Sequence, residues 1–312
     1  MKSHLLTNYK TLYKIKDMLL NKNDTTYYSR NIINKKIIDT NTISIVMTAC
    51  NRSVQTYFTL KTIKESKHKN VQIIIVDDST FDPVLLDNLK TFDMHIELIN
   101  IKNKYWINPC INYNIGFQFI KGDKIIIQNA EVCHLGDVID YVANNIIDNK
   151  YYVFNVLTIA NMENNYKLHN ILPFNYHKIQ EISELCGSRY YGIWYQHHIH
   201  RNSYFHFLTA CTKKTFDTIK GFDIDYALGI EYDDVQLVFD INSYNITFIN
   251  VQEQILGVHQ WHKQTASGSL SNNINNNVLY DCKKKYYNNN KKLLQFTSFN
   301  ENELVDVINT HL

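Results

Sequence analysis

Short runs rich in β-branched residues alternate with helical patterns in the first half of the chain. Strand-like runs lie at 42–48, 71–76, 95–99 and 125–127, and helical patterns separate them at 57–64, 85–89 and 112–120. Strands and helices alternating at this spacing predict βαβ units and a mainly parallel sheet. The expected fold class is therefore α/β, a Rossmann-like sheet flanked by helices.

The two ends and the second half of the chain follow other patterns. Residues 1–41 are predicted to form one or two helices, because Leu12, Ile15 and Leu19 have near-helical spacing. Further strands are expected at 151–157, 207–211 and 246–251, with a short helix stopped by Gly221 and an acidic helix start at Asp233. The tail beyond residue 267 is rich in Asn and then in Lys, and it shows no chemistry.

Polar residues follow three of the predicted strands, at Thr48–Arg52, Asp77–Asp78 and Asn129–Glu131. Parallel strands end at one edge of a sheet, where ligands of open α/β sheets bind. We therefore expect these side chains to converge on a common crevice. For any single cluster the alternative is helix capping by a side chain such as Ser53.

Composition narrows the class of protein. Apolar residues make up 45% of the 312 residues, which is enough for a sizeable core, and the net charge of +2 does not favour nucleic acid. The six cysteines include no CxxC pair, which favours reduced thiols in a cytoplasmic compartment. The N-terminus reads as neither a signal peptide nor a transmembrane segment. Abundant Asn, Ile, Lys and Tyr indicate an A+T-rich genome, such as a viral one.

Five motifs occur in an order that resembles the family 2-like glycosyltransferases of the GT-A fold. Ile43–Arg52 is similar to V-S-I-V-x-P-T-Y-N-R, Ile73–Thr80 to I-I-V-V-D-D-G-S, Asn112–Asn129 to N-x-G-x-x-x-A-x-G-D-Y-I-x-x-x-D, Lys220–Asp223 to G-G-F-D-E, and Asp233–Val235 to E-D-V. His259–His262 stands at the place of a late histidine. The resemblance covers roughly residues 42–265.

The resemblance implies an inverting glycosyltransferase of the hexosyltransferase type. Such an enzyme moves a sugar from a UDP-sugar donor to a hydroxyl of a glycan or glycoprotein acceptor, in a single displacement. The chain would then comprise an N-terminal helical extension (1–41), a nucleotide-sugar-binding half (42–137), an acceptor-binding and catalytic half (138–265) and a C-terminal tail (266–312). The oligomeric state stays open.

The expected metal site departs from the family's D-x-D motif, because this chain has Asn129-Ala130-Glu131. Glu131 is the first candidate ligand for Mn²⁺ (or Mg²⁺), with Asn129 helping and His259 completing the site. A histidine ligand favours Mn²⁺ over Mg²⁺. The alternative for His259 is a packed or surface histidine, and His262 is the competing ligand.

The resemblance also implies a set of donor contacts. These are Thr48, Ala49, Arg52, Asp77, Asp78, Gln128 and Asn129. An acceptor-only carboxylate at Asp78 suits the imide N–H of uracil. Asp77 has the alternative role of holding its loop together, and Cys50 replaces a tyrosine that would stack on the base.

Two carboxylates, Asp233 and Asp234, are candidates for the general base that takes the proton of the acceptor hydroxyl. Adjacent carboxylates raise one another's pKa, which suits a base at neutral pH. Asp234 is preferred because it aligns with the acid that serves as base in the family. The alternative is that they stabilise a helix dipole.

Aromatic and histidine residues between Tyr190 and His206 form a candidate acceptor wall, to which Trp106 and Trp261 could contribute. His198 and His200 have metal binding as an alternative role. Other functions are weaker. No GxGxxG follows the first strand, which disfavours dinucleotide binding, and residues 49–53 lack the glycine expected of a nucleotidyltransferase. The remaining alternative is a non-catalytic carbohydrate-binding or scaffold protein, which the Asn129 replacement favours.

Overall fold

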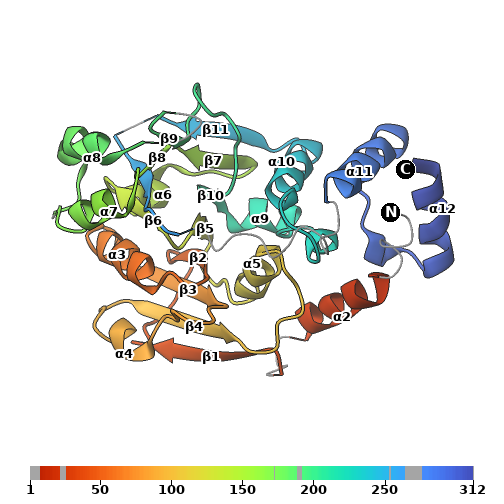
Figure 1. Cartoon of the computed structure of the whole chain (residues 1–312), viewed down its shortest axis with the longest axis horizontal. Helices are drawn as coiled ribbons and strands as arrows, with labels where there is room; N and C mark the ends of the chain where they lie inside the picture. Colours follow the sequence, from red (N-terminus) through yellow and green to blue (C-terminus); the bar gives the residue numbers. More distant parts are fainter. Residues whose placement is uncertain are drawn as a thin grey trace.

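The computed structural model describes residues 8–21, 26–171, 173–187, 192–252, 254–263 and 276–311 (Figure 1). The strands are β1 (Tyr28–Ile33), β2 (Ile43–Ala49), β3 (Val71–Asp77), β4 (His95–Ile101), β5 (Lys124–Asn129), β6 (Val132–Leu135), β7 (Lys150–Phe154), β8 (Val156–Thr158), β9 (Trp194–Gln196), β10 (Leu208–Thr212), β11 (Thr247–Val251) and β12 (Leu256–His259). The α-helices are α2 (Tyr9–Leu20), α3 (Ser53–Lys64), α4 (Leu86–Leu89), α5 (Cys110–Phe117), α6 (Val138–Asn145), α7 (Met162–Leu168), α8 (Ile179–Leu185), α9 (Lys213–Ile219), α10 (Asp233–Ser243), α11 (Asn276–Asn290) and α12 (Glu301–His311). Single 3₁₀ turns are η1 (Tyr176–Lys178), η2 (Ile224–Tyr226) and η4 (Phe296–Ser298).

An eight-stranded sheet in the order β1-β4-β3-β2-β5-β10-β7-β11 forms the centre of the molecule. The four strands predicted in the first half, β2 to β5, pair in parallel within it. Every residue of β3 is buried, as is nearly all of β2, because helices cover both faces. This is the α/β architecture expected from the alternating pattern.

A second sheet, in the order β6-β12-β8-β9, branches from the first. The run expected as one strand at 151–157 divides at Asn155 into β7, in the large sheet, and β8, in the small one. In the small sheet β12 pairs with β6 so that His259 lies opposite Val132. This register places His259 beside Val132, which is the residue that follows Glu131.

The N-terminal extension is helical only in its first part. The helix α2 ends at Leu20, and residues 28–33 form β1 on the edge of the large sheet, antiparallel to β4. The expectation of helices up to residue 41 was therefore wrong for this segment. Alternating burial along β1 is typical of an edge strand with one covered face.

The C-terminal tail is anchored to the body by polar contacts and packs beside α2 (Figure 1). Tyr13 donates its hydroxyl to the carbonyl of Phe299 at 3.0 Å, and Lys16 Nζ donates to Thr297 O at 2.8 Å. The buried ammonium of Lys283, on α11, donates to Asp223 Oδ2 at 2.6 Å and to Asp225 Oδ2 at 2.5 Å. The tail is therefore tied to the segment that precedes Asp233.

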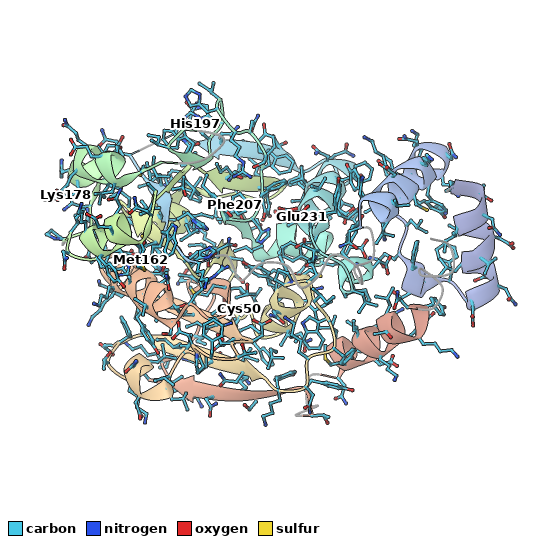
Figure 2. The ribbon with its side chains drawn as sticks, viewed as in Figure 1. Cys50, Met162, Lys178, His197, Phe207 and Glu231 are labelled. Atoms are coloured by element: carbon cyan, nitrogen blue, oxygen red, sulfur yellow. The ribbon has the colours of Figure 1, made fainter. Side chains whose placement is uncertain are left out.

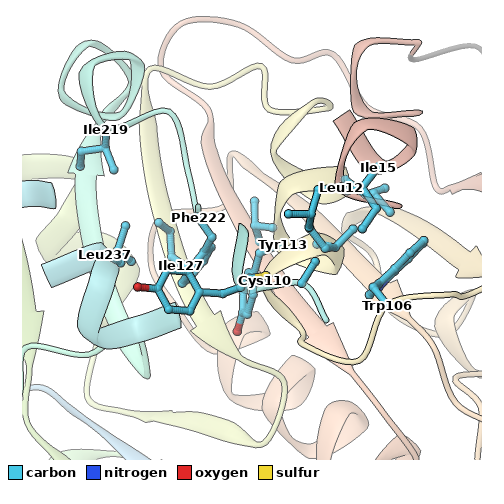
Figure 3. Packing of buried hydrophobic residues seen from close by; sticks show 14 of the residues in the cluster. Leu12, Ile15, Trp106, Cys110, Tyr113, Ile127, Ile219, Phe222 and Leu237 are labelled. Atoms are coloured by element: carbon cyan, nitrogen blue, oxygen red, sulfur yellow. The ribbon is translucent and has the colours of Figure 1, made fainter. Parts of the chain in front are cut away.

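The largest apolar cluster joins α5, the large sheet and the two ends of the chain. In Figure 3, Tyr113 and Cys110 of α5 lie near Ile127 and Phe222, while Trp106 lies near Leu12 and Ile15. Gly116 allows α5 to approach the sheet closely, since a Cβ there would lie 2.8 Å from Val46 Cγ1. Among the described residues, none of the helices combines the length and hydrophobicity needed to cross a bilayer.

Candidate active site

A cleft opens where β2, β3 and β5 end. Strand register places Thr48 beside both Asn129 and Val76, and Ala49 beside Asp77. The cleft has a volume of about 720 Å³. Figure 2 shows three of its lining residues, Cys50, Phe207 and Glu231, near the centre of the molecule, although they lie on segments far apart in sequence.

Most of the predicted site residues line this cleft. From the strand ends and the start of α10 they are Thr48, Arg52, Asp78, Asn129, Glu131, Asp233 and Asp234. The single rim expected from three parallel strand ends is therefore present, and α10 brings the two aspartates to the same cavity.

Three predicted donor contacts do not line the cleft. Asp77 is buried and accepts from the backbone N–H groups of Ser79 at 2.9 Å and Val84 at 2.7 Å, so it holds its loop together, as its alternative role required. Gln128 points into the protein, where its amide donates to Val132 O at 3.0 Å and its oxygen lies 2.8 Å from His134 Nε2. Ala49 is also buried. We assign none of these side chains to the donor.

Asp78 has a cationic neighbour that the motifs did not indicate. Lys104, from the segment after β4, forms an ion pair with it. Cys50 lies beside this pair, and burial together with the charge of Asp78 raises the pKa of its thiol to about 11. Cys50 is therefore a neutral wall of the pocket at neutral pH and not a nucleophile.

Glu131 is the most densely contacted carboxylate in the cleft. Its Oε1 pairs with the guanidinium of Arg52 and lies 3.5 Å from His259 Nε2 and 3.7 Å from His262 Nε2. Burial raises the pKa of Glu131, but Arg52 and the two histidines outweigh it, and the pKa lies well below its usual range. Burial and the charge of Arg52 lower the pKa of His262 to about 4. Glu131 is thus ionised and His262 neutral at neutral pH.

Several polar atoms in this cluster have no hydrogen-bond partner within the described structure. They are Glu131 Oε2, His259 Nε2 and Arg52 Nε. A second Arg–Glu–His group, built around the fully buried Glu97, provides a comparison. Both of its carboxylate oxygens are used, by Arg30 Nε at 2.6 Å and by Gln72 Nε2 at 2.7 Å. Buried polar groups are normally paired. The unpaired atoms around Glu131 therefore indicate a binding site for a ligand or ion, whereas the fully paired group around Glu97 does not.

The unpaired atoms fit a divalent cation. One atom from each of Glu131, His259 and His262 lies within 4.8 Å of the others, and this is the one such set of His, Cys, Asp and Glu among the described residues. A carboxylate with neutral imidazoles suits first-row transition metals. Asn129 also lines the cleft, and its Oδ1 accepts from the hydroxyl of Tyr113 at 3.1 Å. His259 and His262, considered as alternatives, both reach the same carboxylate.

Asp233 and Asp234 differ in their surroundings. Asp233 is buried and accepts from Asn108 Nδ2 at 3.0 Å, and burial raises its pKa. Asp234 is half-buried, and its Oδ1 accepts from the N–H of Val235 at 2.8 Å. Burial, and then the charge of Asp233, raise the pKa of Asp234 to about 7. Asp233 is thus fixed by a neighbour, whereas Asp234 has the properties of a proton acceptor near neutral pH.

The turn before these aspartates is strained. Glu231 and Tyr232 both line the cleft with positive φ, 64° and 65°, which costs about 1–3 kcal/mol for each non-glycine residue. Asn276, at the start of α11, donates to the carbonyl of Glu231 at 2.8 Å. The C-terminal tail, for which the sequence suggested no role, therefore braces the turn that aims Asp233 and Asp234.

The aromatic segment contributes only part of the predicted acceptor wall. Its cleft-lining residues are Tyr195, Arg201, Phe205 and His206, and the next residue, Phe207, lines the cleft as well. Trp106 lies in the core, where its indole N–H donates to Asn112 at 2.8 Å, and the expectation that it contacts an acceptor was wrong. Trp194, Trp261, His198 and His200 are not among the lining residues, and 188–191 lie outside the described residues.

Comparison with known proteins decides the family. The profile of glycosyl transferase family 2 matches residues 44–208, which is more than half of the chain. The chain belongs to this family. No curated protein matches the sequence significantly.

Two solved structures share the fold of this family 2 glycosyltransferase. GalNAc-T7, determined with UDP, GalNAc and Mn²⁺, superposes with a TM-score of 0.52 at 11% identity, over 86% of this chain and 55% of its own. TarS 1-349 from S. aureus, in complex with UDP-GlcNAc, gives 0.50 at 8% identity, over 74% of this chain and 62% of its own. This chain thus spans little more than half the length of these proteins. The GT-A fold expected from the motifs is confirmed.

Two residues at this cleft were not indicated by the motifs. Lys104 lies in a loop, and the sequence alone does not show that this loop passes Asp78. Tyr113 was expected only as part of a helical segment, yet its hydroxyl donates to Gln128 O at 2.8 Å and to Asn129 Oδ1. Pairing between segments distant in sequence sets both positions.

Proposed function

We propose that this family 2 glycosyltransferase transfers a hexose from a UDP-sugar to a hydroxyl of a glycan or glycoprotein, with inversion at the anomeric carbon. The observation that carries the proposal is that one cleft is lined both by Glu131, whose cluster with His259 and His262 contains atoms without hydrogen-bond partners, and by Asp234, whose pKa is about 7. The GalNAc-T7 and TarS structures contain UDP or UDP-GlcNAc, and the former contains Mn²⁺. Both support this choice of donor, and GalNAc-T7 supports the choice of metal.

In this proposal Glu131, His259 and His262 hold Mn²⁺, with Asn129 nearby. When bound, the ion supplies Lewis acidity that stabilises the leaving diphosphate. Asp78 accepts a hydrogen bond from the uracil imide, and its ion pair with Lys104 holds the carboxylate in place. Thr48 lines the donor side of the cleft beside Asn129.

Asp234 is the proposed general base. It accepts the proton of the acceptor hydroxyl as that oxygen attacks the anomeric carbon, so that a single displacement inverts the configuration. Asp233, held by Asn108, keeps a second negative charge beside Asp234 and so maintains its raised pKa. Tyr195, Phe205 and Phe207 provide apolar surface for the acceptor or the transferred sugar.

A donor screen tests the proposal directly. UDP-, GDP- and dTDP-sugars are compared by thermal unfolding with and without Mn²⁺, and release of the nucleoside diphosphate is then measured. A UDP-sugar at about 100 times its Kd should stabilise the fold by about 2.7 kcal/mol, and only with Mn²⁺. If no donor yields free nucleotide while sugars still bind, the chain is a carbohydrate-binding protein and the enzymatic proposal is wrong.

The pH dependence of transfer should follow Asp234. A base with a pKa of about 7 is lost as the pH falls, so kcat should drop about tenfold for each pH unit below that value. Measuring kcat and donor affinity at the same series of pH values separates protonation of the base from loss of binding. A kcat that stays constant well below neutral pH would contradict the assignment.

A further inference from the structure

Arg52 and a metal ion would compete for one carboxylate oxygen. The guanidinium contacts Oε1 of Glu131, and both candidate histidine ligands face that same oxygen. Glu131 Oε2 and His259 Nε2 have no hydrogen-bond partner in the described structure. The arrangement therefore has unused ligand atoms, but the guanidinium of Arg52 already neutralises its single formal negative charge.

The charge balance makes this competition strong. Asn129 supplies a neutral oxygen where the family motif supplies a carboxylate, so Glu131 is the one anionic ligand of the set. Ligand charge is a main determinant of cation affinity. With Arg52 in place, the charges of Glu131 and Arg52 sum to zero, and a divalent ion is only weakly attracted to the site.

The backbone of Arg52 is held separately from its guanidinium. Its backbone is fixed at the start of α3, where its carbonyl accepts from Thr56 N at 2.9 Å. Its side chain lines the cleft, is 21% exposed, and has an unpaired Nε. In the closed group around Glu97, by contrast, Arg30 uses both Nε and a terminal nitrogen on the same carboxylate oxygen.

We propose that Arg52 holds Glu131 in the free protein in place of a divalent cation, and that the diphosphate of the donor draws the guanidinium away, so that metal and nucleotide bind cooperatively. A diphosphate is a stronger partner for guanidinium than a single carboxylate, because it offers bidentate acceptors with more charge. The inference rests on the proposed function, since it takes Glu131, His259 and His262 as the metal ligands. By linkage, the metal must raise nucleotide affinity by the same factor.

Binding of Mn²⁺ without donor tests this, using electron paramagnetic resonance of the free ion and the wild-type, Arg52→Gln and Arg52→Lys proteins. Arg52→Gln should bind Mn²⁺ about tenfold more tightly than wild type, and Arg52→Lys, which keeps the charge, should stay close to wild type. UDP should tighten Mn²⁺ binding by about 5–150-fold in wild type, and by about tenfold less in Arg52→Gln. The Mn²⁺-dependent gain in Tm should also be larger in Arg52→Gln.

Lys104→Gln is the matched control, because it removes a cation from the same cleft that pairs with Asp78 and not with Glu131. Its Mn²⁺ affinity without nucleotide should change by less than about threefold, as expected for an exposed, screened charge. Equal or weaker Mn²⁺ binding by Arg52→Gln would overturn the competition. If Glu131→Gln binds Mn²⁺ as wild type does, or if no variant binds it, the metal site itself is misplaced and the inference falls with it.

Discussion

Asp234→Asn should lower the rate of sugar transfer by about 10²–10⁴-fold, with UDP affinity changed by less than about twofold. The amide keeps the shape of the side chain and can accept from Val235 N, but it cannot accept the proton of the acceptor hydroxyl. Single-turnover transfer with saturating donor, together with calorimetric titration of UDP and Mn²⁺, measures the two effects separately.

Stability provides an internal control for that variant. Burial and the charge of Asp233 raise the pKa of Asp234 from 3.8 to about 7 in the folded state. The stability that this carboxyl contributes is therefore lost as the pH rises from the lower to the higher of these values. Asp234→Asn should therefore raise Tm at pH values above about 7, so that a loss of activity in this variant cannot be attributed to unfolding. Asp233→Asn is the companion variant. If it loses transfer while Asp234→Asn retains it, the base is Asp233.

Glu131→Gln should abolish Mn²⁺ binding and, with it, Mn²⁺-dependent UDP binding. Loss of an outer partner of a metal ligand typically costs about 10–100-fold in affinity, and loss of the single anionic ligand should cost more than about 100-fold. Equilibrium dialysis of Mn²⁺ with and without UDP gives the result. Unchanged affinity would exclude Glu131 as a ligand.

The same substitution leaves Arg52 without its partner, so folding must be controlled separately. Removing one member of a buried ion pair costs about 3–5 kcal/mol of folding stability. The cost of Glu131→Gln should be smaller, because the Arg52 that it leaves unpaired is partly exposed to solvent. The double variant Glu131→Gln/Arg52→Gln removes both charges and should recover much of the lost Tm. It should still fail to bind Mn²⁺, which separates loss of the ligand from loss of the fold.

The central sheet was predictable because fully buried parallel strands carry dense β-branched runs, as in β3 and β5. The rim formed by Thr48, Asp78 and Asn129 followed from parallel pairing alone. What escaped prediction depends on contacts between segments distant in sequence. Side-chain direction turned Gln128 inward toward His134, and the loop after β4 brought Lys104 to Asp78.

Composition misled at both ends of the chain. The helical spacing that ends at Leu20 gave no warning of β1, because the alternation of β1 is short and rich in polar residues. The Asn- and Lys-rich tail was expected to have no role, yet it contains Asn276, which contacts the turn before Asp233, and Lys283, which contacts Asp223 and Asp225. A polar residue in a polar segment carries no signal until its partner is known.

The hydrogen bond from α11 to the turn before Asp233 makes the placement of the two aspartates depend on the docking of this helix. If α11 detaches, Glu231 and Tyr232 lose the donor that offsets their strained backbone, and the two aspartates after them lose their fixed direction. If the free energy of docking were only about 1.4 kcal/mol, α11 would be undocked in roughly one molecule in ten, and the apparent rate constants would fall by that fraction. Any ligand that loosens α11 would thus act as an inhibitor from outside the cleft.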